Sequence, residues 1–283
     1  MRKNQINTAD YLRGQDFHIK KKYGQNFLTD MNILPRIVEE SDVTKDDTVL
    51  EIGPGTGNLT VLLADAAKKV IAVEIDKELI PILRVTFFPR ENVEINNLDI
   101  MKTDLSDLLS GVEGNIRVVA NLPYYITTPV ITKLLEESHF FKSITVMVQK
   151  EVAERLAAEP GSKEYGAITL FSQYYSVPKI LFSVPKESFY PMPKVESAIV
   201  RFDILEKTPY DVKNSALMFD LIRAAFNERR KTLANAISDA GNLNFSKADV
   251  LDVLEKMRLS PTIRGERLSL EEFANLSDML GSN

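Results

Sequence analysis

The chain has 283 residues, no Cys, no Trp and a formal net charge of −5 at pH 7. The absence of Cys excludes disulfides, thiol nucleophiles and Cys-ligated metal centres, and its two His, His18 and His139, have no neighbouring His with which to form a metal site. We therefore expect no metal. With 44% hydrophobic and 27% charged residues the composition is that of an ordinary globular protein, and the length suits two domains.

No apolar run approaches the roughly 20 residues that are needed to cross a bilayer. The N-terminal segment is basic but lacks the apolar core of a secretory signal. We therefore predict a cytoplasmic protein with no membrane partner. Since no feature of the sequence points to an obligate dimer, we expect a monomer.

The first 22 residues form a basic arm on this acidic protein. They hold six Lys or Arg, among them Lys20, Lys21 and Lys22, against two Asp. Phosphate binding requires such a local concentration of cations, whatever the average charge. The arm is therefore a candidate nucleic-acid contact, and the alternative is ordinary solvated surface charge.

Short β-branched runs then alternate with helical patterns, which indicates βαβ units and a parallel sheet. Helices are expected at Leu59–Ala67 and Lys77–Val85. Strands are expected at Thr48–Ile52, Val70–Glu74, Val93–Ile95, Ile116–Ala120 and Ile144–Val148. Two later runs, Lys179–Phe182 and Ala198–Phe202, are separated by a Pro-containing turn and predict an antiparallel hairpin at the sheet edge.

After about Leu205 the pattern becomes purely helical. Helical periodicity covers Ser215–Ala240, Ser246–Arg258 and Ser269–Leu280, and the last begins with the Ser and Glu spacing of a capping box. The expected organisation is an arm and loop over 1–30, an α/β domain over 31–205 and a small all-α domain over 206–283.

The strongest local signal is a Gly-rich loop, Gly53-Pro54-Gly55-Thr56-Gly57-Asn58, between a strand and a helix. Glycines allow a tight turn and a close approach to a ligand. A nicotinamide-dinucleotide fingerprint requires Gly where Asn58 stands, and Pro54 removes a backbone donor from the loop. The loop therefore suits a ligand without phosphates better, and a plain βα turn is the structural alternative.

Carboxylates follow the next two strands. Glu74 ends the second strand and can accept both hydroxyls of an adenosine ribose, whereas Asp76 suits a helix N-cap. Asp99 follows the third strand and can accept from an adenine amino group, although alone it would be an ordinary loop residue. Because parallel sheets bind ligands at the carboxyl ends of their strands, these positions together predict a site for S-adenosylmethionine.

The segment Asn121-Leu122-Pro123-Tyr124 follows the fourth strand and indicates the chemistry. The exocyclic amine of adenine is a poor nucleophile, and acceptors can hold it so that its lone pair faces a methyl donor. The Asn121 side-chain oxygen and the Leu122 carbonyl are such acceptors. Tyr124 can stack on the base, a contact worth ~1–3 kcal/mol. The alternative is a turn with a Pro and a packed Tyr.

The chain resembles the ribosomal RNA adenine N6-dimethyltransferase family, within the class I methyltransferases. Matching segments run through most of the chain in the family's order. They are Gly24–Leu28, Glu51–Asn58, Val73–Asp76, Asn121–Tyr124, Phe189–Val195 and Ala225–Lys231. The resemblance implies an α/β fold that is Rossmann-like, with a seven-stranded, mostly parallel sheet, an antiparallel last strand and a helical C-terminal domain.

The resemblance is nearest to the branch that dimethylates two adjacent adenosines near the 3′ end of 16S rRNA. It implies S-adenosylmethionine as the cofactor and 16S rRNA within the small ribosomal subunit as the partner. By the same resemblance, residues 1–30 would close over the cofactor, 31–205 would bind it and catalyse the transfer, and 206–283 would bind RNA.

The resemblance also implies roles for individual residues. Phe189 would stack on the target adenine opposite Tyr124, and Asn121 and Leu122 would act with them in catalysis. The implied cofactor contacts are Asn26, Leu28, Gly53, Gly55, Glu74, Asp99 and Asn121. From the residues alone, Phe189 is a packed loop aromatic and Asn26–Leu28 is part of a polar loop.

A second basic cluster, Arg223, Arg229, Arg230 and Lys231, is a further candidate for RNA binding. On one continuous helix, positions 223, 230 and 231 would share roughly one side, and solvated surface charge is again the alternative. Three other functions stay open at this point: a 23S rRNA adenine methylase of the macrolide-resistance type, a ribosome-assembly factor that acts mainly by binding, and a nicotinamide dehydrogenase, which Asn58 disfavours.

Overall fold

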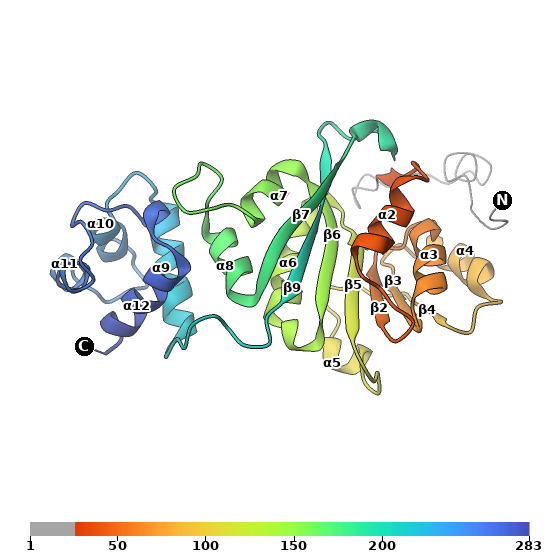
Figure 1. The fold of residues 1–283 in the computed structure, drawn as a ribbon, viewed down its shortest axis with the longest axis horizontal. Coiled ribbons are helices and arrows are strands. Elements are labelled where there is room, and N and C mark those ends of the chain that lie inside the picture. Colours follow the sequence, from red (N-terminus) through yellow and green to blue (C-terminus); the bar gives the residue numbers. More distant parts are fainter. Residues whose placement is uncertain (1–25, 283) are drawn as a thin grey trace. The chain divides into compact units, whose positions relative to one another are not determined.

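The structure is a computed structural model that describes residues 26–282 (Figure 1). The chain forms two compact units. One runs up to Ala153 and includes Pro178–Ile204, and the other combines Glu154–Val177 with the chain from Leu205 onward. The predicted RNA contacts Lys20, Lys21 and Lys22 lie outside the described residues.

A seven-stranded sheet forms the centre of the first unit. Its strands, in spatial order, are β4 (Val93–Asn96), β3 (Lys69–Val73), β2 (Thr48–Ile52), β5 (Ile116–Asn121), β6 (Ser143–Gln149), β9 (Ser197–Ile204) and β7 (Ser176–Val184). The pairs from β4 to β6 are parallel, and β9 is antiparallel to β6. The expected mostly parallel sheet with an antiparallel last strand is confirmed.

The central strands are apolar because both faces of the sheet are covered. On one face, Val49, Val119, Met147 and Ile199, from four neighbouring strands, pack in one cluster with residues of α2 and α3. The helices of this unit are α2 (Ile33–Glu40), α3 (Asn58–Ala66), α4 (Leu79–Phe87), α5 (Leu105–Leu108) and α6 (Thr127–Glu136), and α7 (Lys150–Leu156) leads out of it. A separate two-stranded sheet pairs β1 (Phe27–Leu28) with β8 (Phe189–Tyr190).

The second unit is built from helices around its own core. They are α8 (Ala167–Tyr175), α9 (Ser215–Asn227), α10 (Leu233–Ser238), α11 (Lys247–Lys256) and α12 (Leu270–Leu280). The capping box of α12 is confirmed: the Ser269 N–H donates to Glu272 at 2.7 Å and the Glu272 N–H donates to the Ser269 hydroxyl at 3.2 Å. Among residues 26–282, no helix is long and apolar enough to cross a bilayer.

The structure differs from the sequence prediction in two places. Residues 154–177 pack with the C-terminal helices, because Tyr165 is fully buried in that core and donates to the Leu268 carbonyl at 2.9 Å. The single helical stretch expected over 215–240 is broken after Asn227, because Thr232 caps a new helix by accepting from the Asn235 N–H.

Candidate active site

The candidate site lies where the strand order of the sheet reverses. The chain goes from β2 to β3 and β4 on one side, and later to β5 and β6 on the other. Open α/β sheets bind ligands at this switch point, outside the carboxyl ends of the strands. The loops after β2, β3, β4 and β5 therefore meet at one edge of the sheet, as the sequence predicted.

The Gly-rich loop after β2 adopts backbone conformations that favour glycine. Gly55 has φ +59°, and a Cβ atom on it would lie 3.2 Å from the ring of Phe27. Gly57 has φ +86° at the N-cap of α3, and a Cβ there would lie 2.7 Å from the ring of Phe87. Gly57 thus serves the packing of α4 on α3, whereas Gly55, unlike Gly57, lines the pocket described below.

Glu74, directly after β3, is buried and supports this loop. One of its carboxylate oxygens accepts from the Gly55 N–H at 3.2 Å and the other from the Asp76 N–H at 2.8 Å. Burial raises the pKa of Glu74, and these main-chain donors oppose the rise. Each carboxylate oxygen has a second lone pair, so Glu74 can still accept from a ligand.

The N-cap of α4 is Glu78 and not Asp76, so the N-cap role that the sequence suggested for Asp76 is wrong, although Asp76 does support the turn before the helix. The Asp76 carboxylate accepts from the Glu78 N–H at 3.2 Å in the turn that leads into α4, which begins at Leu79 rather than Lys77. Asp76 does not line the pocket and Asp99 does. One carboxylate oxygen of Asp99 accepts from the Met101 N–H at 3.0 Å, and the side chain is about one-third exposed.

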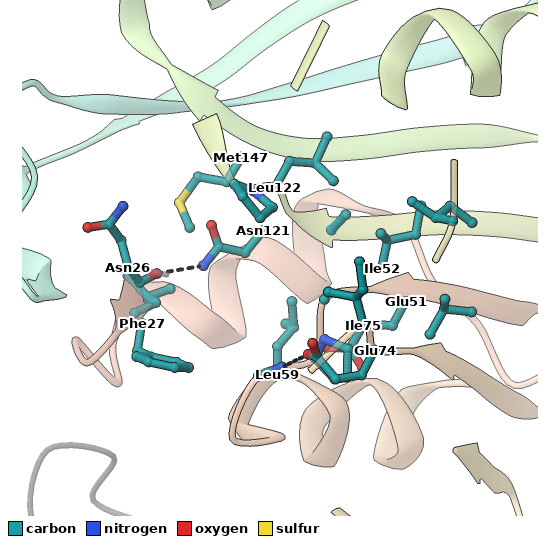
Figure 2. Close-up of a pocket in the computed structure, with 18 of the residues that line it drawn as sticks. Asn26, Phe27, Glu51, Ile52, Leu59, Glu74, Ile75, Asn121, Leu122 and Met147 are labelled. Carbon is teal, nitrogen blue, oxygen red and sulfur yellow. Dashed lines mark hydrogen bonds between the residues drawn. The ribbon is translucent and has the colours of Figure 1, made fainter. Parts of the chain in front are cut away.

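Hydrogen bonds fix several groups of the corner Asn121–Tyr124 at the end of β5. The Asn121 side-chain nitrogen donates to the Asn26 carbonyl at 3.3 Å, a bond that Figure 2 marks. The Pro123 carbonyl accepts from the Ile126 N–H and from the Thr127 hydroxyl, both at 3.1 Å, which fixes the turn. The hydroxyls of Tyr124 and Ser197 lie 2.7 Å apart.

One pocket in the described part of the chain brings most of the predicted site together. Asn26, Glu74 and Asn121, which Figure 2 labels, line it from three separate segments. Its lining includes nine of the ten predicted catalytic and cofactor-binding residues: Asn26, Leu28, Gly53, Gly55, Glu74, Asp99, Asn121, Leu122 and Tyr124.

Phe189 is the exception. It is 4% exposed, pairs with Leu28 between β8 and β1, and packs in the apolar cluster of the sheet rather than lining the pocket. In this structure Phe189 therefore has the packing role that the sequence alone suggested. Its stacking on a base stays a prediction.

Carboxyl groups, and no cationic side chain of the described residues, line the pocket. Glu51, Glu74 and Asp99 line it, and none of its described lining residues is Lys or Arg. Glu51 is 1% exposed, and one of its oxygens has no hydrogen-bond partner among residues 26–282. Burial, with a smaller contribution from the charge of Glu74, raises the pKa of Glu51 to about 8. Such a pocket fits a cationic ligand rich in donors and opposes a pyrophosphate.

The basic cluster of the second unit differs from its expected form. α9 ends at Asn227, so residues 230 and 231 lie beyond the helix, and the prediction that they share a helix side with Arg223 is wrong. Arg229 pairs with Glu266 at 3.1 Å and Lys231 with Asp239 at 3.0 Å. Arg223 pairs with Asp220. Arg230 is exposed and has no partner in the described part of the chain.

A family model described as ribosomal RNA adenine dimethylase matches residues 16–276 of the chain. The chain belongs to this family. It is thus an rRNA adenine dimethyltransferase, and its cofactor is S-adenosylmethionine, to which the charge and donor requirements of the pocket correspond.

Curated relatives of the dimethylase are similar over nearly their whole length. A protein named ribosomal RNA small subunit methyltransferase A from Lachnoclostridium phytofermentans is 48% identical over 96% of this chain and 95% of its own. A protein of the same name from Clostridium acetobutylicum is 46% identical over 97% and 98%.

Two solved structures are also similar. A dimethyladenosine transferase from Plasmodium falciparum superposes with a TM-score of 0.74 at 31% identity and covers 87% of this chain and 94% of its own. The 23S rRNA methyltransferase ErmE has a TM-score of 0.71 at 24% identity over 90% and 100%, a likeness that concerns the fold alone.

Two further residues, one in the dimethylase's pocket and one in contact with its lining, were not predicted from the sequence. Glu51 had a signal, because a carboxylate inside the apolar strand Thr48–Ile52 must be either paired or functional. Ser197 had none, because a Ser at the start of a strand is ordinary and only the tertiary structure places it on Tyr124.

Proposed function

We propose that this dimethylase transfers methyl groups to the N6 amines of two adjacent adenosines near the 3′ end of 16S rRNA, during assembly of the small ribosomal subunit. The observation that carries the proposal is the convergence of Glu74, Asp99 and the Asn121–Tyr124 corner on one pocket at the carboxyl ends of neighbouring strands. The small-subunit names of the relatives support the choice of RNA.

The bound cofactor supplies an electrophilic methyl group on a sulfonium. Glu74 would accept from its ribose hydroxyls, and Asp99 from its adenine amino group. Asn26, Leu28, Gly53 and Gly55 would line the remainder of the cofactor site. The carboxylates bring negative charge to a cationic molecule, and burial strengthens that attraction by lowering the local dielectric.

Asn121 and Leu122 would orient the target amine. The Asn121 nitrogen already donates to Asn26, so the amide oxygen is the atom that is left to accept from the amine. Among residues 26–282, no group donates to the Leu122 carbonyl oxygen, which leaves it as a second acceptor. Two acceptors hold the amine with its lone pair toward the methyl group. The amine becomes acidic once alkylated, so its proton can leave to water.

Tyr124 and Phe189 would take the adenine between them, which offsets the few kcal/mol that base extrusion costs. Since Phe189 is buried here, its part in the stack requires the β1–β8 segment to rearrange. The two basic clusters, Lys20–Lys22 and Arg223 with Arg229–Lys231, would hold the RNA backbone. The proposal divides the chain into an arm over 1–30, a catalytic part over 31–205 and an RNA-binding part over 206–283. Residues 154–177 are the exception, because they belong to the second unit.

The expected absence of a metal and the monomeric state stay predictions, as does a cytoplasmic location, where bacterial subunits are assembled. Among the described residues, no group of three or more His, Asp or Glu is placed to hold a metal ion.

The test is methylation of small ribosomal subunits that lack these modifications. The protein is incubated with labelled S-adenosylmethionine and the subunits, and the RNA is digested and analysed for N6,N6-dimethyladenosine. Primer extension then locates the product. We expect two adjacent modified adenosines near the 3′ end of 16S rRNA, and absence of the nucleoside would overturn the proposal.

Primer extension and a complementation test with an inactive variant together separate the rival functions. Modification of 23S rRNA in place of 16S rRNA would identify a macrolide-resistance type of activity. Full rescue of subunit maturation by an Asn121→Ala variant that does not methylate would favour an assembly factor that acts mainly by binding.

A further inference from the structure

Ser197 contacts the candidate base-stacking residue from outside the pocket. Its hydroxyl lies 2.7 Å from that of Tyr124, which lines the pocket, whereas Ser197 is fully buried and does not line it. The two residues lie 73 positions apart, so the contact depends on the tertiary fold.

The antiparallel strand of the sheet brings Ser197 to this place. β9 runs opposite to β6, so its first residue, Ser197, pairs with Gln149 at the carboxyl end of β6. The neighbouring strand β5 ends at the same edge with Asn121, which pairs with Met147. A parallel strand at this position would have presented its last residue here. The reversal thus places the start of β9 beside the turn that follows Asn121.

Other hydrogen bonds hold the backbone of the turn at Tyr124 but do not involve its ring. The Pro123 carbonyl, with its two donors, fixes the turn at Tyr124–Ile126. A tyrosine side chain still has rotamers to choose from in such a turn. The bond to Ser197 is the one hydrogen bond of the Tyr124 hydroxyl in the described part of the chain.

We propose that Ser197 is a positioning residue for methyl transfer: its hydroxyl anchors Tyr124 so that the ring stands ready to stack on the extruded adenine. This inference rests on the proposed stacking role of Tyr124. Because this hydrogen bond orders the ring before the RNA binds, its loss should affect the reaction with the RNA substrate and not the affinity for the cofactor. Tyr124 is partly buried and Ser197 is fully buried, so water has little access to their hydrogen bond. The bond therefore keeps the Tyr124 ring in one orientation.

The test is a double-mutant cycle with Ser197→Ala and Tyr124→Phe, each of which removes one hydroxyl. We expect either variant to lower kcat/KM for the small subunit by about three- to tenfold, in line with one net hydrogen bond. The double variant should lose no more than the larger single loss, because the bond is already broken. The affinity for S-adenosylmethionine, measured by calorimetry, should not change. Ser197→Thr, which retains the hydroxyl, should restore most of the activity.

Ser176→Ala provides a matched control. Ser176 is also buried and opens a strand, but its hydroxyl donates to the Ser172 carbonyl and not to Tyr124. A merely structural effect of losing a buried hydroxyl would appear equally in this variant, and we expect its activity to match the wild type.

The outcomes distinguish this inference from the function on which it rests. Tyr124→Ala that methylates normally would remove the stacking role and with it this proposal. If Tyr124→Ala is inactive while Ser197→Ala is fully active, or if the two single losses add in the double variant, Ser197 does not position the ring although the proposed function stands.

Discussion

The Asn121 side-chain amide donates to the Asn26 main-chain carbonyl at 3.3 Å, across 95 residues of sequence. The bond joins the corner after β5 to the segment that enters β1. It also assigns the two ends of the amide, because a nitrogen that is held by a carbonyl leaves the oxygen to accept from a substrate. Asn26 would thereby set the orientation of the catalytic amide through its backbone.

Replacement of Asn121 by Ala removes an acceptor that is aimed at the amine, and we expect the single-turnover rate on small subunits to fall by about 10²–10³-fold. Asn121→Asp retains the acceptor oxygens but cannot donate to Asn26, so its rate should lie between those of Ala and wild type. Thermal unfolding of all three proteins provides the control for folding. An undiminished rate for Asn121→Ala would exclude the proposed role.

Glu74 accepts from the Gly55 N–H in the Gly-rich loop, and in the proposed function it also accepts from the ribose of the cofactor. Glu74→Gln keeps the size of the side chain but loses the charge and one acceptor, and bonds to charged groups contribute about 1.5–3 kcal/mol. We therefore expect the Kd for S-adenosylmethionine to rise by about ten- to hundredfold in calorimetry. Glu94→Gln is the matched control, because Glu94 is exposed on β4 and pairs with Lys69 at 2.7 Å, away from the pocket. Equal affinities of the Glu74 and Glu94 variants would contradict the assignment.

The buried Glu51 predicts a pH dependence of stability. Its pKa is about 8 in the folded protein and 4.5 ordinarily, so between these values the unfolded chain is ionised at this position while the folded one retains the proton. The contribution of protonated Glu51 to the free energy of unfolding is therefore complete below pH 4.5 and is lost as the pH rises to 8. Glu51→Gln removes this dependence, so the free energy of unfolding of the variant should rise relative to that of the wild type from pH 5 to pH 8.

Urea unfolding across that pH range measures the difference. Parallel pH profiles of the two proteins would show that Glu51 titrates normally. Because a cation in the pocket favours the charged carboxylate, binding of S-adenosylmethionine at pH 7 should also release protons, which calorimetry in buffers of different ionisation enthalpy detects.

The sequence predicted the sheet well because each strand is locally apolar and is followed by its own polar signal. β2, β3 and β5 begin and end within a residue of their expected bounds, and Glu74, Asp99 and Asn121 lie at the carboxyl ends of their strands, with Asn121 as the last residue of β5. These are local properties of the chain. The position of β9 between β6 and β7, which delivers Ser197, depends on contacts between distant segments that no local pattern encodes.

The errors have the same origin. Helical periodicity runs through 215–240, but Thr232 caps a new helix and so divides this stretch in two. A single capping residue is enough to start a new helix, and the periodicity of the apolar residues does not reveal it. Residues 154–175 lack strand runs, but because they lie before β7 in the chain the sequence prediction groups them with the sheet. Their side chains, with Tyr165 foremost, complete the core of the second unit instead.

Gly57 gives a prediction for stability that is separate from catalysis. An Ala there combines φ +86° with a Cβ atom 2.7 Å from the Phe87 ring, so we expect a loss of about 2–4 kcal/mol in the free energy of unfolding. Gly241→Ala is the control, since its Cβ would have no neighbour within 4 Å, and it should stay within about 0.5 kcal/mol of the wild type. Equal losses in the two variants would remove the packing argument.

Arg230 is the cation of the second basic cluster that is best placed to contact phosphate, because its neighbours already pair with carboxylates. Arg230→Gln should weaken binding to small subunits and lower the slope of log K against log salt concentration by about 0.7–1, the effect of one lost phosphate contact. Binding is measured by filter retention over a range of salt. Arg84→Gln, which removes an exposed cation from α4 in the other unit, should leave the slope unchanged. If both variants change the slope equally, the effect is one of net charge, and if Arg230→Gln leaves it unchanged, this turn does not hold the RNA backbone.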